Sequence, residues 1–228
     1  MLLQQLISSF GGPSAAAKRR VAEARRELIG AVAPRRPLAA AERRAADAAI
    51  VALAAAANEQ PFDLRALGPG EFQVVYASGG FPLWRATADL AEKLSGGARR
   101  RPSPSNDYDG DGSGVVASQQ FDPRTRRLVN RVDYGPLVVS AYGEFTSLSD
   151  GPPVFPAAVR ADVQGGRLDF TRGGGGGEDD EAGGRGGGWA VSLPIRGQGL
   201  FEVLYADQSI RIFKSQSSIS VQMPRRRR

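Results

Sequence analysis

The chain has 228 residues, which is enough for one medium-sized domain with an accessory segment. It contains no cysteine and no histidine, so disulfides, thiolate chemistry, an imidazole base and histidine-ligated metals are excluded. The formal net charge is +6, of which residues 1–60 carry +4, residues 61–224 carry −2 and the terminal arginines 225–228 carry +4. The positive charge thus lies at the two ends of the chain and not in its central region. This distribution argues against a nucleic-acid-binding domain and favours contact with an anionic membrane surface.

Residues 1–60 are predicted to form a helical segment. Leucine and isoleucine recur at helical spacing within 2–10, and Ser14 can cap a second helix. A third helix is expected over 39–57, where the sequence is rich in alanine and Asn58 follows. Acidic residues in this segment argue against a transit peptide, and we predict neither a secretory signal nor a transmembrane helix.

In residues 61–224 the sequence pattern changes to short apolar runs. Several runs alternate apolar and polar residues, and most are separated by turn residues. This pattern is typical of β-strands. Eight or nine strands of this kind predict a closed antiparallel barrel or a sandwich. The expected strands are 71–77, 126–133, 137–145, 157–163, 167–170, 189–193, 200–206, 209–214 and 218–223.

Two insertions, 95–114 and 165–188, interrupt the strands and are expected to be mobile loops, because neither offers enough apolar area to offset its ordering entropy. The acidic stretch Asp107–Gly112 resembles the start of an EF-hand calcium loop. However, the twelfth position of that loop is Ser118 where glutamate is needed, so a polar hairpin insertion is the alternative interpretation. We predict no other metal site.

Two arginine runs, 99–101 and 225–228, can bind phosphates or lipid headgroups, or can remain solvated charge. No aromatic residue lies beside either run, so we predict no nucleic-acid partner. Trp84 follows a predicted strand and can contact a ligand at a barrel mouth or pack as a plug.

The C-terminal segment Gly199–Ile212 resembles the plastid fibrillins, also called plastid lipid-associated proteins. In that family a strand is followed by a Tyr-x-Asp turn and an Arg-Ile strand, which here correspond to Tyr205, Asp207 and Arg211. Upstream, Gly70–Gly79 is similar to an early family segment, with Phe72 in place of a tryptophan and with Tyr76 retained. Gln120 and Asn130 match two further family signals between these segments.

This resemblance implies a mainly β fold in which N-terminal helices accompany a lipocalin-like antiparallel β-barrel of about eight or nine strands. It also implies a chloroplast location at thylakoid membranes or plastoglobules, and a non-catalytic protein that binds a lipid, an isoprenoid or a quinone without a cofactor. Asp207 is expected to fix a turn, with Arg211 paired to it or to another acid. The candidate ligand contacts are Phe72, Tyr76, Trp84, Gln120, Asn130, Tyr205 and Arg211.

Two other functions remain open from the sequence. The barrel can be filled by side chains and act as a structural coat or scaffold of plastid lipid bodies. Alternatively, the chain can be an enzyme that uses tyrosines and carboxylates, although the absence of histidine makes general acid–base catalysis harder to build. The candidate residues for such an enzyme are Tyr76, Tyr134, Tyr142 and Asp169.

Overall fold

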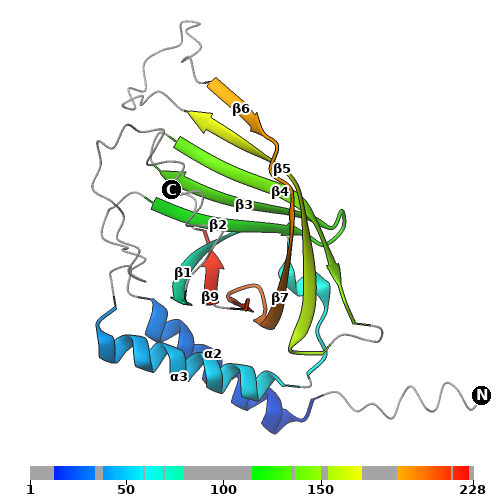
Figure 1. Ribbon diagram of the computed structural model, residues 1–228. Helices are drawn as coiled ribbons and strands as arrows, with labels where there is room; N and C mark the ends of the chain where they lie inside the picture. The colour runs from blue at the N-terminus through cyan, green and yellow to red at the C-terminus, as the bar shows by residue number, and fades with distance from the viewer. Residues whose placement is uncertain are drawn as a thin grey trace, which may run out of the picture.

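In the computed structural model, two helices lie against one side of a strongly curved antiparallel β-sheet (Figure 1). The predicted fold class, a mainly β chain with N-terminal helices and an antiparallel barrel of eight or nine strands, is confirmed. The structure describes residues 13–33, 38–58, 60–68, 70–79, 115–134, 137–149, 154–170, 189–216 and 218–225. The predicted helix within 2–10, the acidic stretch Asp107–Gly112 and Trp84 therefore lie outside the described residues.

Eight of the nine strands close into a ring. The sheet has the order β4-β3-β2-β1-β9-β8-β7-β5-β6, and an additional pairing between β4 and β5 completes the circle. All of the pairings are antiparallel, and β6 lies beside β5 outside the closed ring. The strands are β1 (Glu71–Gly79), β2 (Val115–Asp122), β3 (Arg127–Tyr134), β4 (Leu137–Ser147), β5 (Ala157–Phe170), β6 (Trp189–Leu193), β7 (Gly197–Ala206), β8 (Arg211–Lys214) and β9 (Ser218–Pro224).

Strand β5 corrects two of the sequence predictions. The runs 157–163 and 167–170 form one continuous strand, so residues 165–170 are not part of a loop; the rest of both predicted loops lies outside the described residues. Gly165 is a strand residue that pairs with Tyr142 on β4, and the Tyr142 ring covers it. A Cβ at this position would lie 2.6 Å from the Tyr142 hydroxyl oxygen. Glycine at this position leaves room for the Tyr142 ring. The prediction of a loop failed here because Gly165 begins a glycine-rich stretch of the sequence.

Strand β2 was not among the predicted strands. Its sequence, VVASQQFD, has polar residues at three consecutive positions, which hides the alternation that a half-buried strand normally shows. Pairing with β3 defines it: Gln119 lies opposite Asn130, and Phe121 lies opposite Leu128.

The helices α2 (Ala15–Val32) and α3 (Ala40–Ala57) form where the sequence predicts them. The side chain of Ser14 caps α2 by accepting a hydrogen bond from the amide of Ala17 at 3.2 Å. At the start of α3, the carboxylate of Glu42 accepts a hydrogen bond from the amide of Ala39 at 2.7 Å. Both helices bury one apolar stripe, made of Val21, Leu28 and Val32 on α2 and of Ala46, Ala49, Ile50, Leu53 and Ala57 on α3.

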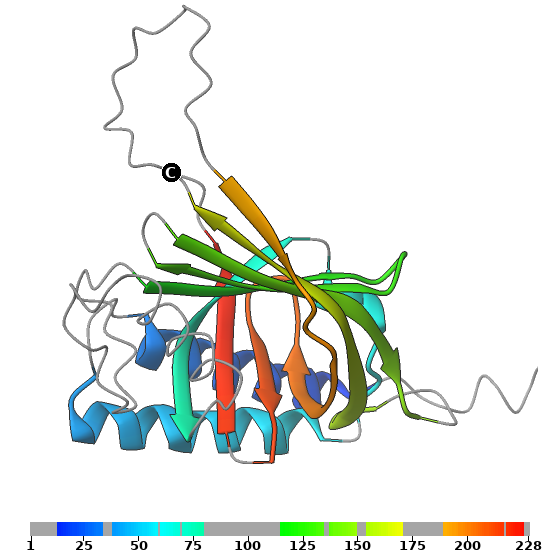
Figure 2. The same cartoon turned by 45° about the horizontal axis from the view of Figure 1, so that its top comes forward.

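The strands β1, β7, β8 and β9 have one face toward the barrel interior and one toward the helices, which run across them in Figure 2. Cross-strand partners share a face, so the pairs Tyr76–Val221, Val221–Ile212 and Ile212–Tyr205 define the helix-facing row. A register shift between Val74 and Tyr76 changes the face that β1 presents to the interior. A similar shift in β7, between Val203 and Tyr205, has the same effect.

Candidate functional site

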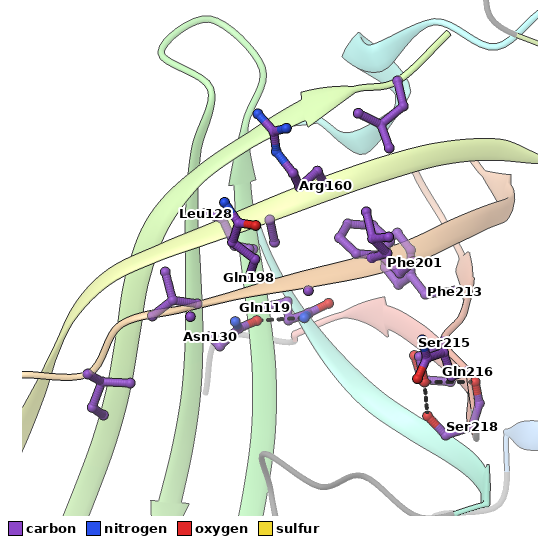
Figure 3. Close-up of a pocket in the computed structure, with 18 of the residues that line it drawn as sticks. Gln119, Leu128, Asn130, Arg160, Gln198, Phe201, Phe213, Ser215, Gln216 and Ser218 are labelled. Atoms are coloured by element: carbon purple, nitrogen blue, oxygen red, sulfur yellow. Dashed lines mark hydrogen bonds between the residues drawn. The ribbon is translucent and has the colours of Figure 1, made fainter.

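A cavity of about 800 Å³ lies inside the barrel (Figure 3). Its walls come from β2, β3, β5, β7, β8 and β9, together with the segments that join β6 to β7 and β8 to β9. Because residues 196–200, at the start of β7, are exposed, the cavity opens to solvent on that side. The lining residues are Gln119, Leu128, Asn130, Leu148, Arg160, Ala161, Val163, Ile195, Arg196, Gly197, Gln198, Gly199, Leu200, Phe201, Phe213, Ser215, Gln216, Ser218 and Ser220.

Small residues on two paired strands keep the cavity open. Gly197 and Gly199 at the start of β7 lie opposite Val163 and Ala161 on β5. A Cβ added at either glycine would have no neighbouring atom within 4 Å, which means that it would enter open space. Larger side chains fit here without steric conflict, so the backbone does not require glycine at these positions. The missing side chains are one reason for the empty volume.

Aromatic rings form the apolar wall of the cavity. Phe201 and Phe213 line it and meet edge to face, with ring centroids 5.3 Å apart. Behind them, the ring of Phe121 lies 5.5 Å from Phe213 and 5.1 Å from Phe145. Phe121 and Phe145 are almost fully buried. This cluster provides a rigid apolar surface that suits the hydrocarbon part of a ligand.

Opposite this wall, three amide side chains form a hydrogen-bonded chain. Gln222 on β9 donates from Nε2 to Oε1 of Gln119 on β2. Gln119 in turn donates from Nε2 to Oδ1 of Asn130 on β3, as Figure 3 shows. Gln222 is buried, whereas Gln119 and Asn130 line the cavity. The chain therefore runs from the interior of the barrel to the cavity surface.

Arg211 lies at the buried end of this amide chain. It is the cross-strand partner of Gln222, and its exposed fraction is 0 %. Its Nη2 donates to the carbonyl oxygens of Leu67 and Gly68, at the end of the short helix η1 (Leu64–Leu67). The guanidinium carbon lies 3.3 Å from the ring centroid of Phe72.

The electrostatic state of Arg211 is unusual for a buried group. Burial lowers the pKa of Arg211 to about 9, which leaves the guanidinium cationic at neutral pH. Among the described residues, none accepts a hydrogen bond from its Nε or Nη1, and Oε1 of Gln222 also has no donor. The sequence prediction that Arg211 pairs with Asp207 or another acid is therefore wrong. The reason is that Arg211 points into the barrel, where it contacts the ring of Phe72 and the carbonyl oxygens at the end of η1.

Asp207 and Tyr205 lie on the helix-facing side of the barrel. Oδ1 of Asp207 accepts hydrogen bonds from the amides of Ser209 and Ile210, at 2.7 and 2.9 Å, and so holds the turn between β7 and β8. Its Oδ2 accepts from the Tyr205 hydroxyl and from Nη1 of Arg25 on α2, each at 2.8 Å. This cluster ties α2 to the barrel.

Tyr76 makes the equivalent contact with α3. Its hydroxyl donates to Oδ1 of Asp47 at 2.7 Å. Burial, followed by this hydrogen bond, raises the pKa of Tyr76 well above its ordinary value. Tyr76 and Tyr205, both candidate ligand contacts, thus face the helices and not the cavity.

The remaining sequence candidates lie in different places. Asn130 lines the cavity, whereas Phe72 packs against Arg211 and neither of these two residues lines it. Gln120 is exposed, and its neighbour Gln119 takes the interior position. Gln119 was not predicted as a site residue. The signal for it is Phe121, which lies two positions later in β2 and therefore on the same, interior face.

Arg225, the first residue of the predicted basic tail 225–228, is bound to the outer surface of the barrel. Its guanidinium pairs with Glu71 at 2.6 Å and with Asp133 at 2.9 Å. The other three arginines of the tail lie outside the described residues. One of the four charges that favoured membrane contact is thus neutralised by the barrel itself.

None of the residues considered for an enzyme is among those that line the cavity. No group of three or more metal-binding side chains occurs within the described residues, and no aspartate or glutamate lines the cavity. Of the residues considered for an enzyme, Tyr142 is 46 % exposed and covers Gly165, and Asp169 pairs with Arg167 at 2.6 Å. The helices that the structure describes include none long and apolar enough to cross a membrane.

Comparison of the chain with models of protein families, with curated proteins and with solved structures found no match.

Proposed function

We propose that this chain is a non-catalytic binding protein that holds one hydrophobic small molecule, a lipid, an isoprenoid or a quinone, inside its barrel. The single observation that carries this proposal is the cavity of about 800 Å³. Cavities of this size are typical of small-molecule sites, which occupy roughly 300–1,000 Å³ and combine apolar walls with a few polar groups. The cavity has both features, in the rings of Phe201 and Phe213 and the amides of Gln119 and Asn130.

The cellular setting of the proposal comes from the sequence. The resemblance to plastid fibrillins supports a place at thylakoid membranes or plastoglobules, where the protein would associate peripherally with the lipid surface. The absence of acidic residues from the cavity lining and of histidine and cysteine from the chain supports binding over catalysis.

The first test is native mass spectrometry combined with lipid extraction, on protein purified from its own host. We expect one molecule of an apolar compound per chain. A protein that carries no lipid, and that binds none when plastid lipids are added, would favour the alternative of a structural coat with no internal ligand.

A variant tests whether the bound molecule occupies this cavity. Gly199→Phe places a ring into space that a Cβ enters without contact, so we expect the variant to fold and to lose most of its lipid. The control is Ala158→Phe on β5, since Ala158 is exposed and its cross-strand partner Glu202 pairs with Lys214 on the outer surface. Equal lipid content in both variants would place the ligand elsewhere.

A further inference from the structure

The hydrogen bonds give the three-amide chain a definite direction, from Gln222 through Gln119 to Asn130. Arg211 and Gln222 are cross-strand partners, and a guanidinium attracts the oxygen of a neighbouring amide more than its nitrogen. Nε2 of Gln222 accordingly points toward Gln119, while its Oε1 accepts no hydrogen bond from Arg211 or from another described residue. Gln119 then accepts through Oε1 and donates through Nε2.

The consequence appears at the cavity surface. Asn130 uses its Oδ1 to accept from Gln119, so the group left over at the end of the chain is the Nδ2 amide, a pure donor. Among the residues that the structure describes, none accepts a hydrogen bond from this nitrogen. The chain of amides thus ends in a donor at the cavity surface.

Charge balance points in the same direction. Buried cations in proteins are normally paired with an anion, because an isolated charge is costly to remove from water. Arg211 is fully buried and contacts two carbonyl oxygens and two aromatic rings, but within the described part of the chain no carboxylate reaches it. The cavity lining includes Arg160 and Arg196 and no acid, and of these two Arg160 is paired with Asp162. A negatively charged ligand in the cavity would therefore meet Arg196 and no competing carboxylate.

We propose that the ligand is an amphipathic carboxylate, a long-chain fatty acid, whose head group accepts a hydrogen bond from Asn130 Nδ2 and whose chain lies against Phe201 and Phe213. This inference rests on the proposed function and narrows it from hydrophobic molecules in general to anionic single-chain lipids. The carboxylate brings a negative charge to a cavity whose lining includes Arg160 and Arg196 and no acid.

The test compares oleate with oleyl alcohol, which has the same chain and a neutral head that can donate as well as accept. Binding of each is measured by displacement of a fluorescent lipid probe at pH 7.5. We expect oleate to bind the unaltered protein at least about tenfold more tightly, as one charge-assisted hydrogen bond in a buried site provides. This comparison needs no variant and so does not depend on whether a variant folds.

The matched variants are Asn130→Asp and Gln120→Glu. Each replaces one amide by a carboxylate on neighbouring strands, but Asn130 lines the cavity and Gln120 is exposed outside. Asp at 130 still accepts from Gln119 and offers the ligand a negative charge in place of a donor. We expect Asn130→Asp to weaken oleate binding at least about tenfold and oleyl alcohol binding less than about threefold, and Gln120→Glu to change neither.

The outcomes separate this inference from the proposed function. Equal affinity of the unaltered protein for oleate and oleyl alcohol would overturn the carboxylate inference and leave a binding protein for neutral lipids. Equal weakening of both ligands by Asn130→Asp would also overturn it. If the unaltered protein binds neither lipid and carries none from its host, the proposed function fails, and the inference fails with it.

Discussion

The two faces of the strands β1, β7, β8 and β9 are organised in opposite ways. On the helix-facing side, Tyr76 and Tyr205 lie in a tightly packed row and their hydroxyls are bound by Asp47 and Asp207. On the interior side, the same strands contribute glycines beside open space and a buried arginine with unbound N–H groups.

This difference separates the part of the molecule that stabilises the fold from the part that is available for binding. Side chains that fill space and satisfy each other's hydrogen bonds leave nothing for a ligand. Conversely, empty volume and unpaired buried donors lower stability, and proteins retain them where function requires it. We therefore expect substitutions on the helix-facing side to change stability, and substitutions in the cavity to change binding with little loss of stability.

The largest expected effect comes from the helix-facing side. Leu53 on α3 is fully buried in the main core, so Leu53→Ala leaves a cavity there and lowers the free energy of unfolding by about 2–5 kcal/mol. Urea denaturation followed by circular dichroism measures this change. The fraction that remains folded should bind lipid with unaltered affinity, and a loss of affinity greater than the loss of folded protein would show that α3 contributes to the site.

Asp207→Ala has the next largest effect. The substitution removes the acceptor of the Ser209 and Ile210 amides and the partner of Arg25, which costs about 1–3 kcal/mol. Thermal melting is the measurement. If the melting temperature is unchanged and lipid binding is lost, Asp207 contacts the ligand and the structural role assigned to it is wrong.

Acid provides a second test of the same residue. Burial acts to raise the pKa of Asp207, but hydrogen bonds from Arg25, Ser209 and Tyr205 outweigh it, so the pKa lies below its ordinary value. A carboxyl with a lowered pKa in the folded state stabilises the protein above about pH 4, the pKa of an unfolded aspartate, and this contribution is lost as pH falls through the folded pKa. We expect Asp207→Asn to flatten the decline of stability below pH 4.

The hydrogen bond between Tyr76 and Asp47 has a smaller expected effect. Tyr76→Phe keeps the ring and removes one hydroxyl, so the free energy of unfolding should fall by about 0.5–1.5 kcal/mol. Combining Tyr76→Phe with Asp47→Ala tests whether the two residues interact directly, because the double variant should then be less destabilised than the sum of the single ones. Strict additivity would contradict a direct contact.

The barrel was predictable from the sequence because most of its strands alternate in a simple way. Phe72 and Val74, for example, recur at every second position of β1 and are buried. The prediction failed where this local signal is absent. In β2 three successive polar residues hide the alternation, and in β5 the glycine pair at 165 and 166 resembles the start of a loop.

The site was less predictable than the fold, because a strand residue changes face with a shift of one position. The bulge between Val74 and Tyr76 turns Tyr76 toward α3, and no feature of the sequence EFQVVYASG marks it. The amide chain was also out of reach, because Gln222 on β9 and Gln119 on β2 are 103 positions apart in sequence and meet only in the folded interior, across β1.

The smallest expected effect has the opposite sign and comes from the cavity. Glycine in a strand interior is destabilising by roughly 0.5–1 kcal/mol relative to alanine, because it loses more backbone freedom on folding. A side chain at Gly199 meets no atom within 4 Å, so Gly199→Val should raise the free energy of unfolding by up to about 1 kcal/mol while it reduces lipid binding. Chemical denaturation and lipid titration of the same sample measure both quantities.

Gly143 on β4 is the matched control for this prediction. A Cβ there would lie 2.0 Å from the carbonyl oxygen of Asp162, so Gly143→Ala should destabilise the barrel, although it adds only one methyl group. The two glycines thus differ in what the fold needs from them: Gly143 is required by the close approach of β5, and Gly199 is not required by any contact. A stabilised Gly199→Val that no longer binds lipid would mean that the barrel gives up stability at this position to keep its cavity open. A destabilised one would mean that the start of β7 needs its glycines for the fold, and that the cavity is a consequence of this need.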